Sequence, residues 1–261
     1  MSILKLAGVE KSYGKLQVLH GIDAEIEDGE IYAIIGPNGA GKTTTFKVMT
    51  GEADCQGGTV IFDGTDVTHA PAYQRTRAGM GRTFQVARVF SQLTTEQNVI
   101  VAIEARQRAH GGTDRPWWAI RPSAATLDEV HELLAGLSLH AKAGIVAKEL
   151  SHGDRKRLEL GITLAGRPKI LMMDEPTAGM SPSDRAGVIE LIRKITAPEH
   201  PGGKRKLTVV MTEHDMSVIF GLADRIMVMN QGRKIAEGGI DEIRNNREVQ
   251  KVYLGKEVHH D

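Results

Sequence analysis

The chain of 261 residues carries 33 lysines and arginines against 33 aspartates and glutamates, so its formal net charge is zero. This balance gives no whole-chain field that would attract polyanions, and nucleic acid is not an expected partner. The length allows a sizeable core in one large domain with an inserted lobe. The single cysteine, Cys55, cannot form an internal disulfide, and Met1 to Leu6 lack the apolar core of a signal peptide. Together these features predict a reducing, cytosolic compartment.

The first part of the chain, to about Val67, is predicted to form short strands. Brief apolar runs with a turn signal after them are typical of strands. The runs cover residues 17–19, 24–26, 31–35 and 59–62, and the last one ends at the turn Asp63-Gly64.

The pattern becomes helical from about Thr94 to Gly166. Thr126 is followed three residues later by Glu129, which is the spacing of a capping box and predicts a helix that starts at Thr126. The apolar residues that follow recur with helical period and line one face; they are Leu127, Val130, Leu133, Leu134 and Leu137.

After Pro168 the apolar runs return, separated by a helix-like stretch. The runs cover residues 170–173, 207–211 and 226–229, the helix-like stretch covers residues 186–195, and residues 198–206 are a predicted surface loop. Strand, helix and strand in alternation predict a mainly parallel sheet, with its ligand site at the carboxyl ends of the strands. The helical middle is therefore a predicted insertion into an α/β core.

The segment from Gly36 to Thr43 fits the pattern G-x-x-x-x-G-K-T. A predicted strand precedes it, a predicted helix over residues 43–49 follows, and Gly51 closes that helix, which is the context of a phosphate-binding loop. Glycines let backbone N–H groups surround a phosphate, and the helix N-terminus adds partial positive charge. Lys42 would neutralise the β- and γ-phosphates while the Thr43 hydroxyl binds Mg²⁺. The alternative is a glycine-rich turn that only joins strand to helix.

Two carboxylates, Asp174 and Glu175, follow the apolar run 170–173 and would lie beside the phosphate loop in a parallel sheet. Because consecutive strand residues point to opposite sides, the two can have different roles. Asp174 is expected to hold Mg²⁺, and Glu175 to orient and deprotonate the attacking water. Alone, such a pair is more often a solvated strand end.

Two further candidates are weaker when judged by position alone. His214 follows the run 207–211, where a neutral imidazole could bind a γ-phosphate oxygen, although most histidines are structural or solvated. Gln85, at the junction of core and insertion, could bind Mg²⁺ or the attacking water through its amide oxygen. The alternative for Gln85 is a solvated loop residue.

These motifs, together with the segment from Leu150 to Leu158, resemble the ATP-binding subunit of ABC transporters, and the resemblance covers nearly the whole chain. It implies an α/β fold with a P-loop NTPase (RecA-like) core, an N-terminal antiparallel β subdomain and an inserted α-helical subdomain. It implies one ABC ATPase domain over residues 1–261. Residues 1–85 and 167–261 would form the catalytic core with the β subdomain, and residues 86–166 the helical subdomain. The implied ligands are ATP and Mg²⁺.

The resemblance also implies roles for individual residues. Tyr13 would stack on adenine, with a half-buried strand tyrosine as the alternative. Ser181 to Asp184 resemble the loop that crosses between subunits. The phosphates of ATP would be bound by Gly36, Pro37, Asn38, Gly39, Ala40, Gly41, Lys42, Thr43 and Thr44. Hydrolysis would involve Lys42, Gln85, Glu175 and His214, and Mg²⁺ binding would involve Thr43, Gln85 and Asp174.

The segment from Leu150 to Asp154, here called the signature segment, reads Leu-Ser-His-Gly-Asp where the family commonly has Leu-Ser-Gly-Gly-Gln. The resemblance implies that Ser151, Gly153 and Asp154 lie at the nucleotide of the opposite subunit, at a helix N-terminus. Ser151 is predicted to cap that helix. A carboxylate here would repel a triphosphate unless it turns back onto its own helix N–H groups, and this capping role is the predicted one for Asp154.

Several segments resemble the branch of the family that imports branched-chain amino acids. They are Gly153-Asp154 and residues 82–85, 213–216, 243–246 and 252–255. Importers of urea or amides and the ATPase of the lipopolysaccharide exporter share parts of these patterns. The implied function is an ATPase subunit that dimerises around ATP and powers a membrane importer, for branched-chain amino acids or a related small polar solute.

A signature segment far from its own phosphate loop implies two subunits that enclose two ATP molecules, as a homodimer or with a related ATPase subunit. No apolar run approaches the roughly 18 residues of a membrane span, so integral membrane permease subunits are the expected partners. A solute-binding protein would act indirectly through them. The chain would then be cytoplasmic and peripheral on the inner face of the cell membrane. Residues 86–93 are the expected permease contact, with local packing as the alternative for Val89 and Phe90.

Other interpretations of the sequence compete with these. Trp117 and Trp118 could touch the membrane interface or the partner, but paired tryptophans more often pack under a loop. A non-transport ATPase of nucleic acid or ribosomes would usually show two cassettes or long coiled-coil arms, and neither is visible. A nucleotide-binding scaffold without hydrolysis would lack the Glu175 carboxylate.

Overall fold

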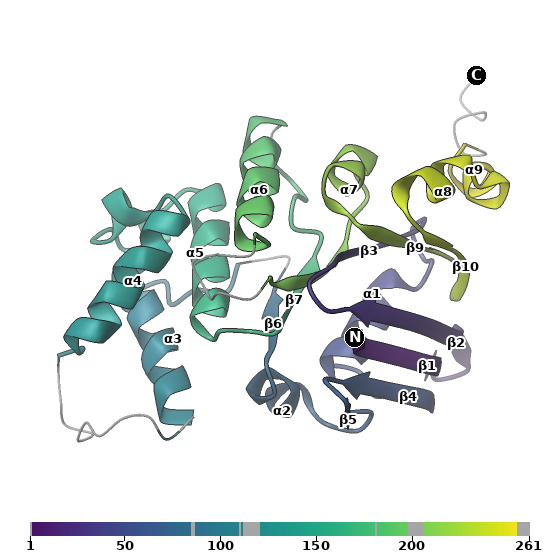
Figure 1. Cartoon of the computed structure of the whole chain (residues 1–261), viewed down its shortest axis with the longest axis horizontal. Coiled ribbons are helices and arrows are strands. Elements are labelled where there is room, and N and C mark those ends of the chain that lie inside the picture. Colours follow the sequence, from purple (N-terminus) through teal and green to yellow (C-terminus); the bar gives the residue numbers. More distant parts are fainter. Residues whose placement is uncertain are drawn as a thin grey trace.

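A six-stranded sheet forms the centre of the molecule (Figure 1). The computed structural model describes residues 2–84, 87–109, 111, 121–180, 182–197 and 206–254, and the statements below concern these residues. The strand order is β10-β9-β3-β8-β7-β6. All neighbouring pairs are parallel except β9 and β10, which confirms the predicted mainly parallel sheet. The strands are β3 (Ile31–Ile35), β6 (Met80–Thr83), β7 (Ile170–Asp174), β8 (Thr208–Thr212), β9 (Arg225–Asn230) and β10 (Arg233–Gly238).

A second, antiparallel sheet lies beside the first, in the order β2-β1-β4-β5. Its strands are β1 (Ser2–Tyr13), β2 (Leu16–Glu27), β4 (Gly57–Phe62) and β5 (Thr65–Asp66). The long strand β1 was not among the predicted strands, although it pairs with both β2 and β4. Helix α1 (Lys42–Thr50) lies between the two sheets (Figure 1). Its Phe46 and Met49 are fully buried with Tyr32 and Ile34 of β3.

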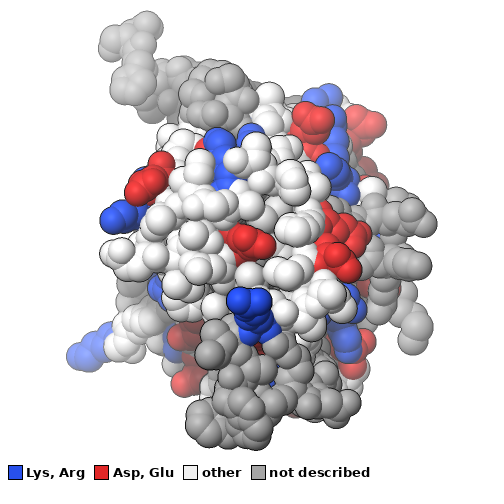
Figure 2. Space-filling view, turned by 90° about the vertical axis from the view of Figure 1, so that its left-hand side faces the viewer, with Lys and Arg blue, Asp and Glu red and all other residues white. Residues whose placement is uncertain are grey.

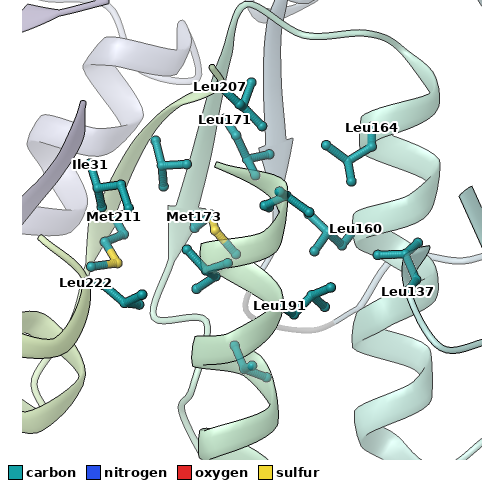
Figure 3. Packing of buried hydrophobic residues seen from close by; sticks show 14 of the residues in the cluster. Ile31, Leu137, Leu160, Leu164, Leu171, Met173, Leu191, Leu207, Met211 and Leu222 are labelled. Carbon is teal, nitrogen blue, oxygen red and sulfur yellow. The ribbon is translucent and has the colours of Figure 1, made fainter. Parts of the chain in front are cut away.

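The central strands are buried on both faces. In β3, Ile31 and Ala33 belong to one core, while Tyr32 and Ile34 belong to the core that contains α1. The first core is covered by α5 (His152–Ala165), α6 (Pro182–Ile195) and α7 (Met216–Leu222). Figure 3 shows the part of this core where β7, α5 and α6 meet, with Met173, Leu160 and Leu191. Continuous apolar runs are what such doubly covered parallel strands require.

The helical part is inserted between β6 and β7 and lies at the left of Figure 1. It consists of α3 (Thr95–Ala109), α4 (Ala124–Gly136) and α5, with the 3-10 turns η1 (His140–Lys142) and η2 (Ala147–Glu149). The predicted fold class is confirmed, while the subdomain boundaries at 85/86 and 166/167 stay predictions. The remaining helices are α2 (Ala72–Arg77), α8 (Ile240–Asn245) and α9 (Arg247–Leu254). No helix in the described part of the chain is long and apolar enough to cross a bilayer.

The predicted capping box at Thr126 is wrong. Helix α4 begins earlier, at Ala124, and Ser123 is its N-cap, with the Ser123 hydroxyl accepting the Thr126 N–H at 3.1 Å. Glu129 is instead bound by the Arg106 guanidinium through two hydrogen bonds of 2.6 and 2.8 Å. Arg106 also donates to the Ala165 carbonyl at 2.6 Å, so this charged pair joins α3, α4 and the end of α5. A bidentate guanidinium partner binds a carboxylate more strongly than a helix N–H does.

The Glu129→Gln variant is expected to lower the free energy of unfolding by about 1–3 kcal/mol, because Arg106 loses a charged, bidentate partner. Hydrogen bonds from Arg106 hold the pKa of Glu129 below its usual 4.5. The stabilisation is therefore present above that pH and is lost as the pH falls through the lowered pKa. Urea unfolding at neutral and acidic pH measures this difference. The control is Glu132→Gln on the exposed side of α4; equal losses in both variants would contradict this role for Glu129.

Candidate functional site

The loop from Gly36 to Gly41 connects β3 to α1 and is held against β9 and β2. A Cβ atom on Gly36 would lie 2.2 Å from the Met229 carbonyl oxygen, so only glycine fits there. Gly41 has a left-handed φ of 97°, and a Cβ there would lie 2.9 Å from Leu19. The two glycines are thus required by close packing and backbone conformation. Gly39 also has positive φ, but no atom lies within 4 Å of its Cβ position, which leaves open space beside the loop.

Lys42, the first residue of α1, is only 6% exposed. Its ammonium group donates to the carbonyl oxygens of Gly36 at 2.7 Å and Pro37 at 3.2 Å. The positive charge therefore lies across the loop at the N-terminus of the helix, where the helix dipole adds to it. This arrangement favours an anion at the loop.

A cavity of about 220 Å³ lies in front of this loop. It is lined by Val18, Asn38, Gly39, Ala40, Gly41, Lys42, Thr43, Thr44, Glu175 and His214. The structure thus brings residues 38–44 of the predicted phosphate-binding loop together with Glu175 and His214, and three of the four predicted hydrolytic residues line this cavity. Val18 was not predicted, because its position in β2 gives no sequence signal. The predicted site residues that do not line the cavity are Tyr13, Gly36, Pro37, Ser151, Gly153, Asp154 and Asp174. Gln85 and Ser181 lie outside the described residues.

The carboxylates at the end of β7 are held by the neighbouring strand β8. Asp174 lies opposite Thr212 in the parallel register, and the Thr212 hydroxyl donates to Asp174 Oδ1 at 2.6 Å. The Glu175 N–H contacts the Thr212 carbonyl oxygen at 3.1 Å and its hydroxyl oxygen at 3.2 Å. Glu175 has a left-handed φ of 48°, which is costly for a residue with a Cβ. Thr212 was not predicted, although its position at the end of an adjacent strand was the available signal.

His214 and Glu175 form a pair at the rim of the cavity. The distance from His214 Nε2 to Glu175 Oε1 is 2.6 Å. Glu213, the residue before His214, is buried. Its carboxylate accepts the N–H of Thr177 at 2.9 Å and the hydroxyl of Thr177 at 2.6 Å. It also accepts the N–H of His214 at 3.1 Å. Glu213 therefore fixes the backbone after Glu175 relative to the backbone of His214. Asp215 caps α7 by accepting the Ser217 N–H at 2.9 Å.

Tyr13 lies at the last position of β1 and is 49% exposed. The Lys11 ammonium is 5.1 Å from the centroid of its ring. Part of the ring is therefore open to a planar ligand, as an adenine-stacking residue requires.

The signature segment leads into α5, and Ser151 is the N-cap of that helix, as predicted. Its hydroxyl accepts the Asp154 N–H at 3.2 Å. The buried Asp154 carboxylate does turn back, but not onto helix N–H groups: its Oδ2 accepts from Ser151 Oγ at 2.7 Å and from Lys142 Nζ at 2.5 Å. Burial acts to raise the pKa of Asp154, but the hydrogen bonds from Lys142 and Ser151 outweigh it and the pKa is lowered. The carboxylate is therefore ionised at neutral pH.

A second buried carboxylate on α5, Glu159, binds the chain on both sides of residues 85–86. Its Oε1 accepts the Phe84 N–H at 3.2 Å and the Arg88 N–H at 3.0 Å, and burial raises the pKa of Glu159. The guanidinium carbons of Arg82 and Arg88 lie 4.9 and 3.8 Å from the centroid of the Phe84 ring. Sequence reasoning missed Glu159, because a charged residue on a helix is usually solvated.

Of the predicted partner contact, residues 86–93, the structure describes residues 87–93. Val89 is partly buried against the core, whereas Phe90 is 55% exposed. Local packing thus accounts for Val89 but not for Phe90. Val86, Trp117 and Trp118 lie outside the described residues.

Comparison with known proteins agrees with this geometry. Residues 19–178 match the family model described as ABC transporter, and residues 233–259 match that of the branched-chain amino acid ATP-binding cassette transporter. The high-affinity branched-chain amino acid transport ATP-binding protein BraF of Pseudomonas aeruginosa is 34% identical over 97% of this chain and 98% of its own length. The corresponding protein LivG of Escherichia coli K12 is also 34% identical, with the same coverage.

Solved structures give the same result. The ADP conformation of MJ1267, an ATP-binding cassette of an ABC transporter, has a TM-score of 0.82 and 27% identity, covering 98% of this chain and 99% of that one. A nucleotide-free ATP-binding cassette from an ABC transporter has a TM-score of 0.80 and 28% identity, covering 97% and 99%. The chain therefore belongs to the ABC transporter ATP-binding family, whose general activity is ATP hydrolysis coupled to transport.

Proposed function

We propose that this chain dimerises around ATP, hydrolyses it, and powers a membrane importer of branched-chain amino acids or a related small polar solute. The observation that carries this proposal is that residues 38–44 of the phosphate loop line one cavity together with Glu175 and His214. The substrate class is supported by the names of the relatives BraF and LivG and by the match of residues 233–259.

In this proposal the loop residues bind the phosphates of ATP. Lys42 neutralises charge on them, and the N–H groups at the start of α1 donate to their oxygens. The Thr43 hydroxyl and the Asp174 carboxylate would hold Mg²⁺, and their chemistry fits, because both are oxygen donors of the kind that this cation prefers. Asp174 is pre-oriented by the hydroxyl of Thr212. The bound cation would supply further charge neutralisation to the phosphates.

Glu175 is the proposed general base for the attacking water. Its backbone is fixed by Thr212, and His214 Nε2 lies close to its carboxylate. A base must be held within hydrogen-bond reach of the proton that it takes, and this pair restricts the carboxylate rotamers. In this arrangement His214 acts on the reaction through Glu175, beside the predicted contact of its imidazole with a γ-phosphate oxygen.

The proposed functional unit contains two ATPase chains, identical or closely related. Ser151 and Gly153 do not line the cavity of their own chain, so contact with nucleotide would require a second copy. Permease subunits would anchor this dimer to the inner face of the cell membrane and receive solute from a binding protein. Glu159 joins α5 to the segment before the helical part, which gives a route by which closure around ATP would reach the permease contact.

The alternative of a nucleic-acid or ribosome ATPase finds no support on the face shown in Figure 2. This face, at the helical end of the molecule, has acidic and basic side chains interspersed among uncharged ones, with no broad basic patch among the described residues. Binding to a polyanion would require clustered positive charge.

The Glu175→Gln variant is expected to bind ATP normally and to slow turnover at least about 10²-fold, because the amide cannot accept the proton of water. It should also accumulate as an ATP-bound dimer. Phosphate release and light scattering after size-exclusion chromatography measure the two effects. Glu190→Gln, on the exposed side of α6, is the control and should hydrolyse ATP normally. Undiminished turnover in Glu175→Gln would remove Glu175 from the role of base.

The His214→Ala variant is expected to lower kcat about 10- to 10²-fold, because Glu175 loses the partner that orients it. If His214 acts through Glu175, the double variant with Glu175→Gln should be no slower than Glu175→Gln alone, within about threefold. Single-turnover hydrolysis is measured for the unmodified chain, the two single variants and the double variant, which together form a double-mutant cycle. Multiplicative losses in the double variant would show instead that His214 acts independently.

A further inference from the structure

Lys142 approaches the signature segment from another element. It lies on the 3-10 turn η1, and its ammonium is 2.5 Å from Asp154 Oδ2. The turn is held in place by the fully buried Leu139. The chain just after it is also held, because the carbonyl oxygens of Ala143 and Ile145 accept N–H groups from the start of α3 at 3.0 and 2.8 Å. The position of the Lys142 backbone is thus fixed by the core of the helical part.

The hydroxyl of Ser151 makes its hydrogen bonds within its own chain. Oγ accepts the Asp154 N–H at 3.2 Å and donates its one proton to Asp154 Oδ2 at 2.7 Å. In this arrangement the exposed Ser151 offers only a lone pair to the outside. A phosphate oxygen is an acceptor, so the hydroxyl proton must turn outward before Ser151 can bind one. Oδ2 of Asp154 then loses the hydrogen bond from Ser151. It keeps a donor, because the Lys142 ammonium already binds the same oxygen.

The charge at this site also needs compensation. Asp154 is ionised and only 6% exposed, and it lies one helical turn from the N-cap. Its negative charge interacts favourably with the helix dipole, but alone it would offset the dipole's attraction for a triphosphate and repel that ligand. Lys142 cancels that charge at direct hydrogen-bond distance, while Arg157, at 3.7 Å from Oδ1, contributes from further away.

We propose that Lys142 is a positioning residue for the nucleotide of the second subunit: it neutralises Asp154 and releases the Ser151 hydroxyl proton for a phosphate oxygen. This proposal rests on the proposed function, because it requires two copies of the chain around ATP. It gives the acidic signature segment a partner that a neutral glutamine at residue 154 would not need.

The test uses the full chain in the Glu175→Gln background and measures the ATP concentration at half-maximal dimerisation, by sedimentation velocity. Lys142→Met is expected to raise this concentration at least about tenfold, because the more distant Arg157 alone is left to compensate the Asp154 charge. Lys142→Arg and the double variant Lys142→Met/Asp154→Asn are both expected to return it to within about threefold of the background. The loss in Lys142→Met should shrink at high salt, since salt screens the repulsion.

One control variant and two further measurements separate this role from a loss of structure. Lys148→Met, on the exposed surface of the adjacent turn η2, should leave dimerisation unchanged. Binding of a fluorescent ATP analogue to the monomeric chain and urea unfolding are measured for every variant. In Lys142→Met the monomer should still bind the analogue normally. A purely structural role would alter unfolding while leaving the ATP dependence of dimerisation among folded chains unchanged, and that result would overturn the inference.

The outcomes also separate the inference from the proposed function. A background chain that binds ATP but never dimerises would overturn the proposed function, and the inference with it. Normal dimerisation of Lys142→Met would overturn the inference alone. Failure of the double variant to recover, while Lys142→Arg dimerises normally, would also overturn it, because neutralisation of Asp154 would then not be what Lys142 provides.

Discussion

The parallel register of strands β3, β8 and β7 is the constraint on which the site depends. Ile34 lies opposite Thr212, and Thr212 lies opposite Asp174. The phosphate loop, the carboxylate pair and His214 therefore emerge at one edge of one sheet, although they are far apart in the sequence. Both faces of these strands are covered by core residues. A one-residue slip would move every side chain to the opposite face, so burial protects the geometry of the site.

Glu175 is the first residue after strand β7, and its backbone conformation is strained. Its left-handed backbone costs on the order of 1–3 kcal/mol, and the surrounding structure must offset that cost. Thr212 contacts its N–H, and Glu213 ties the next turn to the backbone of His214. These contacts direct the Glu175 carboxylate toward His214 and the cavity. The strained position is thus the result of a network that fixes one side chain at the end of a strand.

Helix α5 is joined to its surroundings by a charged residue at its tip, its middle and its end. At the tip, Asp154 binds Lys142 of η1. In the middle, Glu159 binds the backbone on both sides of residues 85–86. At the end, Arg106 binds the Ala165 carbonyl together with Glu129 of α4. In the proposed function this helix carries the signature segment, so its displacement on closure would move the helical part and the segment before it as a unit.

The sequence by itself determined the parts of this protein whose signal is local. Gly36, Gly41 and Lys42 are identifiable because a phosphate loop needs these residue types at fixed spacing. The apolar runs 170–173 and 207–211 are identifiable because strands buried on both faces must be continuously apolar. Ser151 was recognisable as an N-cap for the same local reason.

Only the tertiary structure decided which partners the buried charged groups take. Glu129 had the spacing of a helix cap, but Arg106 from another helix is a stronger partner. Asp154 was expected to bind its own helix and instead binds Lys142, and Glu159 gave no sign that it was buried. Such pairs join residues that are distant in sequence, and the choice among competing donors depends on burial and on geometry that the fold alone supplies.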